Sequence, residues 1–191
     1  QDIMVPETVA QYTFDVTAPT QAILEFAGHP SLNLIKKSGF DTTKLMGNAK
    51  LSGKLAVPMM KGPPPERVIF SAEAKVRDAA LEGALPGIDI TDGVVGVTVE
   101  KGALEAKGPV KINGVPVELT WKRAAGPGGK QSAVIEATLD GDERKKIGVD
   151  LGEFLRGPMA VKADLADLAD PEGRIDIEAD LSESEMQIAA I

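Results

Sequence analysis

The sequence predicts a mainly β protein with a few short helices, in which a long antiparallel meander forms a curved, groove-like or partly closed sheet. Apolar residues recur at every second position over most of the chain, which is typical of strands with one buried and one solvated face. Clusters of Gly and Pro separate these runs and predict turns between them. The length of 191 residues is common for one domain, so we expect residues 1–191 to form a single β-rich unit.

The expected strands follow one another along the chain. Residues 45–57 place Leu45, Leu51 and Leu55 on one face, with lysines and Ser52 opposite. The same alternation predicts strands over residues 66–77, 93–100, 110–112, 115–121, 131–139, 159–165 and 174–181. Asn113-Gly114 is the strongest short signal for a hairpin between two of them.

Two inserts interrupt the strand pattern and are predicted to be helical. Residues 19–38 carry apolar residues at helical spacing and break at Gly28-His29-Pro30, which favours two short helices joined at the proline. Residues 140–156 form the second insert. There Asp142-Glu143 precede three basic residues and a stop at Gly148, the charge order that a helix dipole favours.

Charge and composition narrow the classes of partner. The chain has 21 Lys and Arg against 29 Asp and Glu, a net charge of −8, so we expect no nucleic-acid partner. Without Cys there is no disulfide, thiol nucleophile or Cys-ligated metal, although this does not fix the compartment. No apolar run approaches 18 residues, and the chain starts at Gln1 without a leader pattern. We therefore expect an excised piece whose membrane anchor lies outside it.

The polar residues do not form a recognisable reaction centre. His29 is the single histidine and falls in a predicted turn, so it has no His or Cys partner for a metal site. The acidic run has a spacing of three that differs from a calcium loop, and it is expected to be a solvated turn: Asp164, Asp167, Asp170 and Glu172. We expect no catalytic residues, no metal and no cofactor, and hence a protein that is not an enzyme.

The aliphatic strand faces allow two interpretations. Seven aromatic residues are few, so Val, Ile, Leu and Ala must fill the interior. Either these faces close on a core, or a concave face stays open and shields acyl chains, which need apolar contact without specific polar partners. Periodicity alone does not choose between them. The candidate groove residues are Phe70, Val76, Val95, Val97, Val117, Leu119, Trp121, Ile135, Ile175 and Ile177.

A succession of short motifs is similar to that of a known family. The motifs include Ala22-Ile23-Leu24-Glu25-Phe26, Lys37-Ser38-Gly39-Phe40-Asp41, Leu85-Pro86-Gly87-Ile88, Gly114-Val115-Pro116-Val117-Glu118-Leu119-Thr120-Trp121 and Gly148-Val149-Asp150-Leu151. Their order over residues 20–182 resembles the AsmA-like superfamily, and most closely its YhdP and TamB branch. Each motif consists mostly of Gly, Pro and aliphatic residues, so the order carries the resemblance.

The resemblance implies a function. Such proteins are elongated and periplasmic, tethered to the inner membrane, with a hydrophobic β groove that moves phospholipid between inner and outer membranes. This chain would be one section of that groove, with phospholipid acyl chains as ligands and envelope proteins as possible partners. The alternative is a structural or assembly module of the cell envelope that binds a protein partner through a closed β domain.

Overall fold

The described part of the chain is mainly strand. A computed structural model describes residues 8–28, 42–61, 67–126, 128–152, 154–168, 170 and 173–186. Its strands are β1 (Val9–Pro19), β2 (Leu45–Pro58), β3 (Ile69–Leu85), β4 (Ile88–Glu100), β5 (Ala103–Ile112), β6 (Val115–Arg123), β7 (Gln131–Leu139), β8 (Leu155–Arg156), β9 (Met159–Ala166), β10 (Arg174–Asp180) and β11 (Glu185–Met186). The helices are α1 (Thr20–Ala27), the short 3-10 helix η1 (Thr42–Lys44) and α2 (Gly141–Lys146).

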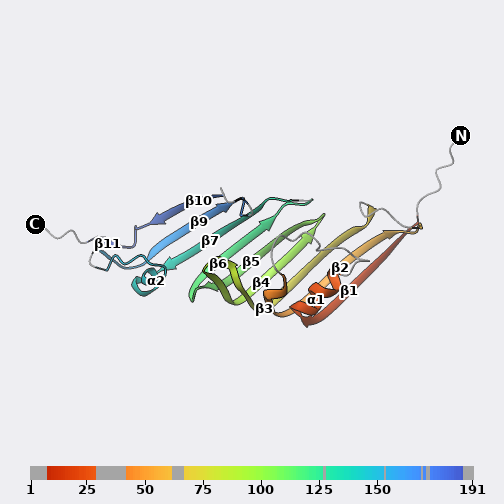
Figure 1. The fold of residues 1–191 in the computed structure, drawn as a ribbon, viewed down its shortest axis with the longest axis horizontal. Helices are drawn as coiled ribbons and strands as arrows, with labels where there is room; N and C mark the ends of the chain where they lie inside the picture. The colour runs from red at the N-terminus through yellow and green to blue at the C-terminus, as the bar shows by residue number, and fades with distance from the viewer. Residues whose placement is uncertain are drawn as a thin grey trace, which may run out of the picture.

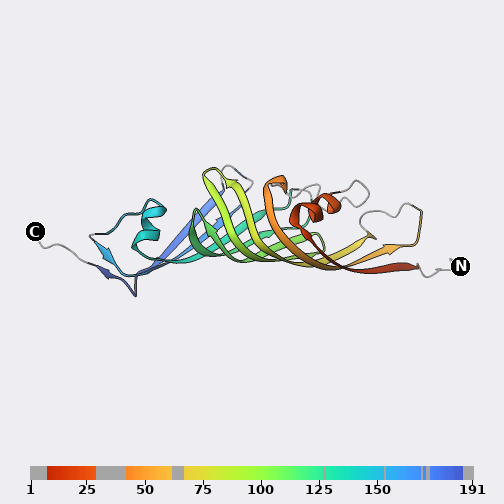
Figure 2. The ribbon, with the colours of Figure 1, turned by 90° about the horizontal axis from the view of Figure 1, so that it is seen from below.

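Nine of the strands form one antiparallel meander. Their order in the sheet is β1-β2-β3-β4-β5-β6-β7-β9-β10, so nearly every strand pairs with the next one along the chain. The sheet is not closed, because β1 and β10 lie at its two ends (Figure 1). The short β8 leaves this sheet and pairs with β11. Figure 2 shows that the sheet curves toward the side that carries α1 and α2, and we call its concave side the trough.

The meander confirms the predicted fold class, and most strand predictions agree with it. The run predicted over 131–139 coincides with β7, and the run over 45–57 lies within β2. The structure extends others: β3 continues to Leu85, and β5 begins at Ala103 rather than near residue 110. Strand β1 was not predicted, although its residues 10–18 alternate in the same way.

The helical predictions are confirmed in part, because among the described residues of the insert over 140–156 only α2 (Gly141–Lys146) is helical and β8 begins at Leu155. Helix α1 forms the first half of the insert over 19–38, and residues 29–41, which include His29, lie outside the described residues. Helix α2 begins at a reciprocal cap. Asp140 Oδ1 accepts from the Glu143 amide at 2.8 Å, and Glu143 Oε2 accepts from the Asp140 amide at 2.9 Å. This capping box satisfies two amide groups that a helix start leaves unpaired.

Arg144 connects α2 to the sheet. Its side chain is 2% exposed and donates to three carbonyl oxygens: Gly157 at 2.7 Å, Leu155 at 3.1 Å and Leu139 at 3.3 Å. A buried guanidinium is tolerated when its donors are satisfied in this way. Arg144 therefore fixes the path from the end of β7 to β8.

A line of irregular positions crosses four neighbouring strands and bends them. Gly47 on β2, Asp78 on β3, Asp92 on β4 and Gly108 on β5 all have positive φ, between 52° and 152°. The strand registers shift beside each of them. Such bulges bend a strand and increase its twist. The curvature of β2 to β5 in Figure 2 follows from this line.

The apolar alternation resumes beyond the bend. Leu81 on β3 pairs with Ile90 on β4, and Ile90 pairs with Ile112 on β5. Asn113 then turns the β5–β6 hairpin, and its side chain bonds the neighbouring β3–β4 turn. It accepts from the Asp89 amide at 2.9 Å and donates to the Gly87 carbonyl oxygen at 2.9 Å. These contacts join adjacent hairpins along one rim of the trough.

Gly108→Ala is expected to lower the free energy of unfolding by about 2–4 kcal/mol, because its φ of 152° disfavours a side chain and a Cβ would overlap the Val94 carbonyl. Gly96→Ala is the control: its Cβ would lie 3.7 Å from the Lys107 carbonyl oxygen, and we expect a change within about 1 kcal/mol. Urea denaturation followed by circular dichroism measures both. Equal stability of the two variants would contradict the role given to the bend.

Candidate functional site

One face of the sheet is apolar across all nine strands. Residues that pair directly in an antiparallel sheet project to the same face. Following the pairings from β1 to β10 gives one continuous row of apolar residues: Val16, Leu51, Ala74, Val97, Ala106, Trp121, Ala133, Leu165 and Ile175. A second row continues on the same face through Leu119, Ile135, Ala163 and Ile177. We call this surface the apolar face.

The opposite face is polar. A row next to the first one, again from β1 to β10, runs Asp15, Ser52, Glu73, Thr98, Glu105, Lys122, Ser132, Ala166 and Arg174. Several of its charged residues pair locally, as Lys122 does with Glu105 at 3.3 Å. We call this surface the polar face. It meets solvent without a covering layer among the described residues.

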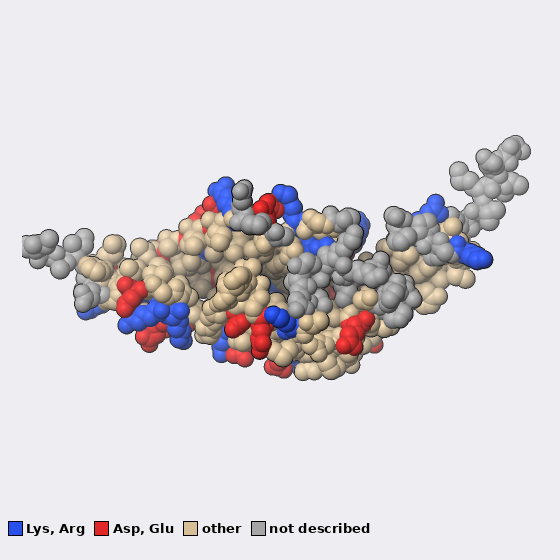
Figure 3. Space-filling model, viewed as in Figure 1, with Lys and Arg blue, Asp and Glu red and all other residues tan. Residues whose placement is uncertain are grey.

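The apolar face is the concave one. Ile23 of α1 packs against Ala49 and Val76 of this face, and α1 lies on the concave side of the strands in Figure 2. Figure 3 looks onto this side. Charged side chains gather toward the margins there, and uncharged residues fill much of the middle. The curved sheet thus presents a trough whose lining is apolar.

All ten candidate groove residues lie on the apolar face, but their surroundings differ. Val76 and Val117 are 6% and 9% exposed and belong to closed core clusters. Ile175 and Ile177 on the end strand β10 are 61% and 69% exposed. The other six are half-buried: Phe70, Val95, Val97, Leu119, Trp121 and Ile135. The face therefore combines core positions with accessible ones.

Two core clusters interrupt the open surface. The larger one joins Val110, Val115 and Val117 to Leu139 and to Leu155 of β8. The smaller one comprises Ala49, Val76 and Ala79, with Ile23 of α1 packed against it. Segments outside the large sheet thus cover the trough locally. Between them the apolar face has no second sheet over it in the described structure.

Sequence reasoning missed the contribution of β1 to this face. Phe14 stacks on Phe70 of β3, with ring centroids 6.1 Å apart and ring planes 9° from parallel. Its ring lies over Gly53 of the intervening strand, where a Cβ would clash with it. The alternation of Tyr12, Phe14 and Val16 was the signal that could have found this strand.

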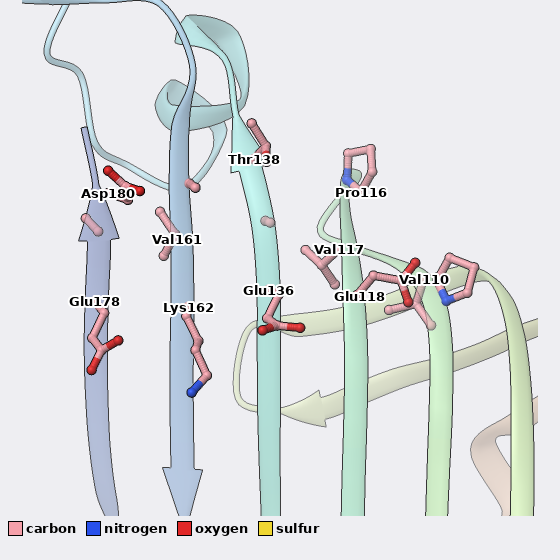
Figure 4. A pocket seen from close by; sticks show the side chains of 14 residues that line it. Val110, Pro116, Val117, Glu118, Glu136, Thr138, Val161, Lys162, Glu178 and Asp180 are labelled. Atoms are coloured by element: carbon pink, nitrogen blue, oxygen red, sulfur yellow. The ribbon is translucent and has the colours of Figure 1, made fainter. Parts of the chain in front are cut away.

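A hollow of about 690 Å³ lies along the strands from β5 to β10, and residues of both faces line it, Val117 and Val161 of the apolar face among them. Residues of the polar face line most of it, including Glu118, Glu136, Lys162 and Glu178 (Figure 4). The Lys162 ammonium donates to Asp164 at 2.9 Å, and this bond raises the pKa of Lys162 with smaller help from Glu178 and Glu136.

No metal-binding arrangement occurs among the described residues. No three His, Cys, Asp or Glu side chains in that part of the chain come together in a way that could hold an ion. Within the predicted acidic run, Asp164 pairs with Lys162, and Asp167 pairs with Lys130 at 2.8 Å. Glu172 lies outside the described residues.

Comparison with protein-family models, with curated proteins and with solved structures gives no match. In the described part of the chain, no helix is long and apolar enough to cross a membrane. The site must therefore be interpreted from its own geometry and chemistry.

A charged substitution should lower the free energy of unfolding much more at a buried position of the apolar face than at an exposed one. Val117→Asp is expected to cost about 3 kcal/mol or more in unfolding free energy, because Val117 is 9% exposed within the larger cluster. Ile177→Asp should change stability by about 0.5 kcal/mol or less, because Ile177 is 69% exposed. Urea unfolding measures both. A stable Val117→Asp variant would show that this cluster is open to water.

Proposed function

We propose that this chain binds phospholipid acyl chains in its trough and forms one section of a bridge that moves phospholipid between the inner and outer membranes. The observation that carries the proposal is the continuous row of apolar residues across nine strands, on the concave side of a sheet that only α1 and β8 cover locally among the described residues. Apolar surface of this extent in water is unfavourable and marks an interaction site. Acyl chains match it, since they require contact without hydrogen bonds.

The trough supports a passive mechanism. Acyl chains would lie against half-buried residues such as Trp121 and Ile135, and the polar headgroups would stay at the rim in water. No covalent step is involved, so the protein would act without catalytic residues or cofactor. The direction of transfer would be imposed by lipid supply and removal at the two ends.

The proposed location follows the resemblance to the AsmA-like superfamily. We place the protein in the periplasm, tethered to the inner membrane, where a shielded path for lipids between two membranes is needed. Its net charge of −8 suits contact with neutral or basic partners of the envelope better than contact with nucleic acid.

Lipid binding is tested with two matched double variants of β10. Ile175→Lys with Ile177→Lys adds two charges to the apolar face, and Asp176→Asn with Glu178→Gln makes the same charge change on the polar face. We expect the first pair to lower bound phospholipid about tenfold, because two apolar contacts are lost, and the second pair to leave it unchanged. Native mass spectrometry and lipid extraction of protein purified without detergent give the amounts.

Circular dichroism of both double variants should match the unchanged protein, because Ile175 and Ile177 are largely exposed. Phospholipid in the unchanged protein that is lost only from the apolar-face variant supports the proposal. Equal lipid in both variants contradicts binding at this face. A lipid-free protein that instead captures an envelope protein in a stoichiometric complex would favour the assembly-module alternative.

A further inference from the structure

At one corner of the sheet the polar face loses its polar character. The corner comprises the start of β1, the end of β2 with the turn after it, and the start of β3. We call it the apolar tip, and its described residues are 8–12, 55–61 and 67–70. On the polar face of the tip Val9 pairs with Pro58, and Ala56 pairs with Ile69. The apolar face continues on the other side, so both sides of the sheet are apolar here.

The apolar side chains of the tip are largely exposed. Met59 and Ile69 are 67% and 65% exposed, and Val9, Tyr12 and Met60 are exposed as well. A single exposed apolar residue is common on protein surfaces, but these five gather at the ends of three neighbouring strands. A gathering of this kind marks an interaction site.

The turn after β2 has its amide groups satisfied within the protein. The Met59 amide donates to the Thr8 carbonyl oxygen at 2.8 Å, and the Met60 amide donates to the Pro58 carbonyl oxygen at 2.8 Å. An N–H group that enters an apolar medium without a partner is costly, so a segment that enters lipid must satisfy its own amides. The two methionines can therefore leave water without losing a hydrogen bond to either N–H group.

The tip is basic, although the chain as a whole has a net charge of −8. Lys61 follows the two methionines, Arg67 precedes β3, and Lys54 lies next to the tip on the polar face; all three are exposed. The tip residues include no Asp or Glu, and Glu7 and Glu66 lie outside the described residues. Cations around an exposed apolar patch are attracted to anionic headgroups, while the apolar side chains enter the layer beneath.

The tip also lies at one end of the trough. Strand β1 is the first strand of the sheet, so the continuous row of apolar residues begins there. The start of β1 and the end of β2 lie at one extremity of the described molecule, opposite α2 and β11 (Figure 1, Figure 2). A protein partner usually packs on one face of a sheet, whereas a bilayer surrounds an inserted tip on both.

We infer that the apolar tip docks into the surface of an anionic lipid bilayer, with Met59 and Met60 beneath the headgroups and the three cations among them. No described strand pairs with the outer edge of β1. Its free N–H and C=O groups need water, which keeps the insertion shallow. The inference goes beyond the proposed function, because it names the place where the molecule meets a membrane.

Co-flotation with vesicles of equimolar phosphatidylglycerol and phosphatidylcholine tests the docking. The variant is Met59→Gln with Met60→Gln. The control is Phe154→Gln with Met186→Gln, which removes two similarly exposed apolar side chains at the opposite end of the molecule. We expect the methionine variant to bind these vesicles about tenfold more weakly and the control to bind like the unchanged protein. Vesicles of phosphatidylcholine alone should bind the unchanged protein about tenfold more weakly.

A labelled thiol measures the insertion directly. The chain has no Cys, so Met60→Cys provides a single site for an environment-sensitive dye, and Phe154→Cys provides the matched control. On the anionic vesicles we expect a blue shift of the dye at position 60 and quenching by lipids with brominated acyl chains. The dye at position 154 should show neither. Equal quenching at both positions would overturn docking through the tip.

The remaining outcomes separate this inference from the proposed function. Equal flotation of the methionine variant and the unchanged protein overturns the inference, and so does an unchanged protein that binds no vesicles. A dimer that the methionine variant dissociates, measured by light scattering without vesicles, would make the tip an interface between two copies and also overturns it. Phospholipid extracted from the purified protein tests the trough separately. Vesicle docking through the tip by a protein that holds no phospholipid supports the inference while the proposed function fails.

Discussion

Cross-strand register is the constraint on which the rest of this structure depends. Side chains alternate along each strand, so a slip of one residue would move a complete set of side chains to the other face. On β2 such a slip would bring Lys50 and Lys54 into the trough in place of Leu51 and Leu55. The pairings avoid this across nine strands, and the apolar residues of the whole sheet share one side. Everything proposed about the trough follows from that alignment.

Curvature takes the place of a second layer. A flat sheet with one apolar face normally packs against another sheet or a layer of helices. Here the bulges near Gly47, Asp78, Asp92 and Gly108 bend the long strands. Hydrophobic residues beyond the bend, such as Ile90 and Ile112, then pack against the larger core cluster of the apolar face. Helix α1 and β8 add local cover. The result is a trough with closed and accessible sections, which explains why residues of one face range from core to solvent.

The two buried arginines show how differently one side chain can be used. Arg144 is satisfied by carbonyl oxygens and holds α2 and β8 against the end of β7. Arg123 lies on the apolar face at the end of β6, next to Gln131, and its nitrogens are not among the described side-chain atoms that are both buried and unpartnered. Equal burial of the two arginines therefore does not imply an equal role.

The sequence by itself determined the fold class, the turns and the membership of the apolar face. Apolar and polar residues alternate in the sequence because each strand has one apolar and one polar face. Asn113-Gly114 indicates a hairpin because both residues adopt positive φ. It did not reveal β1, which preceded the first recognised element. Only the tertiary structure decided that Val117 is core while Ile177 is exposed, and that Arg123 faces the trough. Those properties depend on bending and on neighbouring strands, which a pattern of period two does not contain.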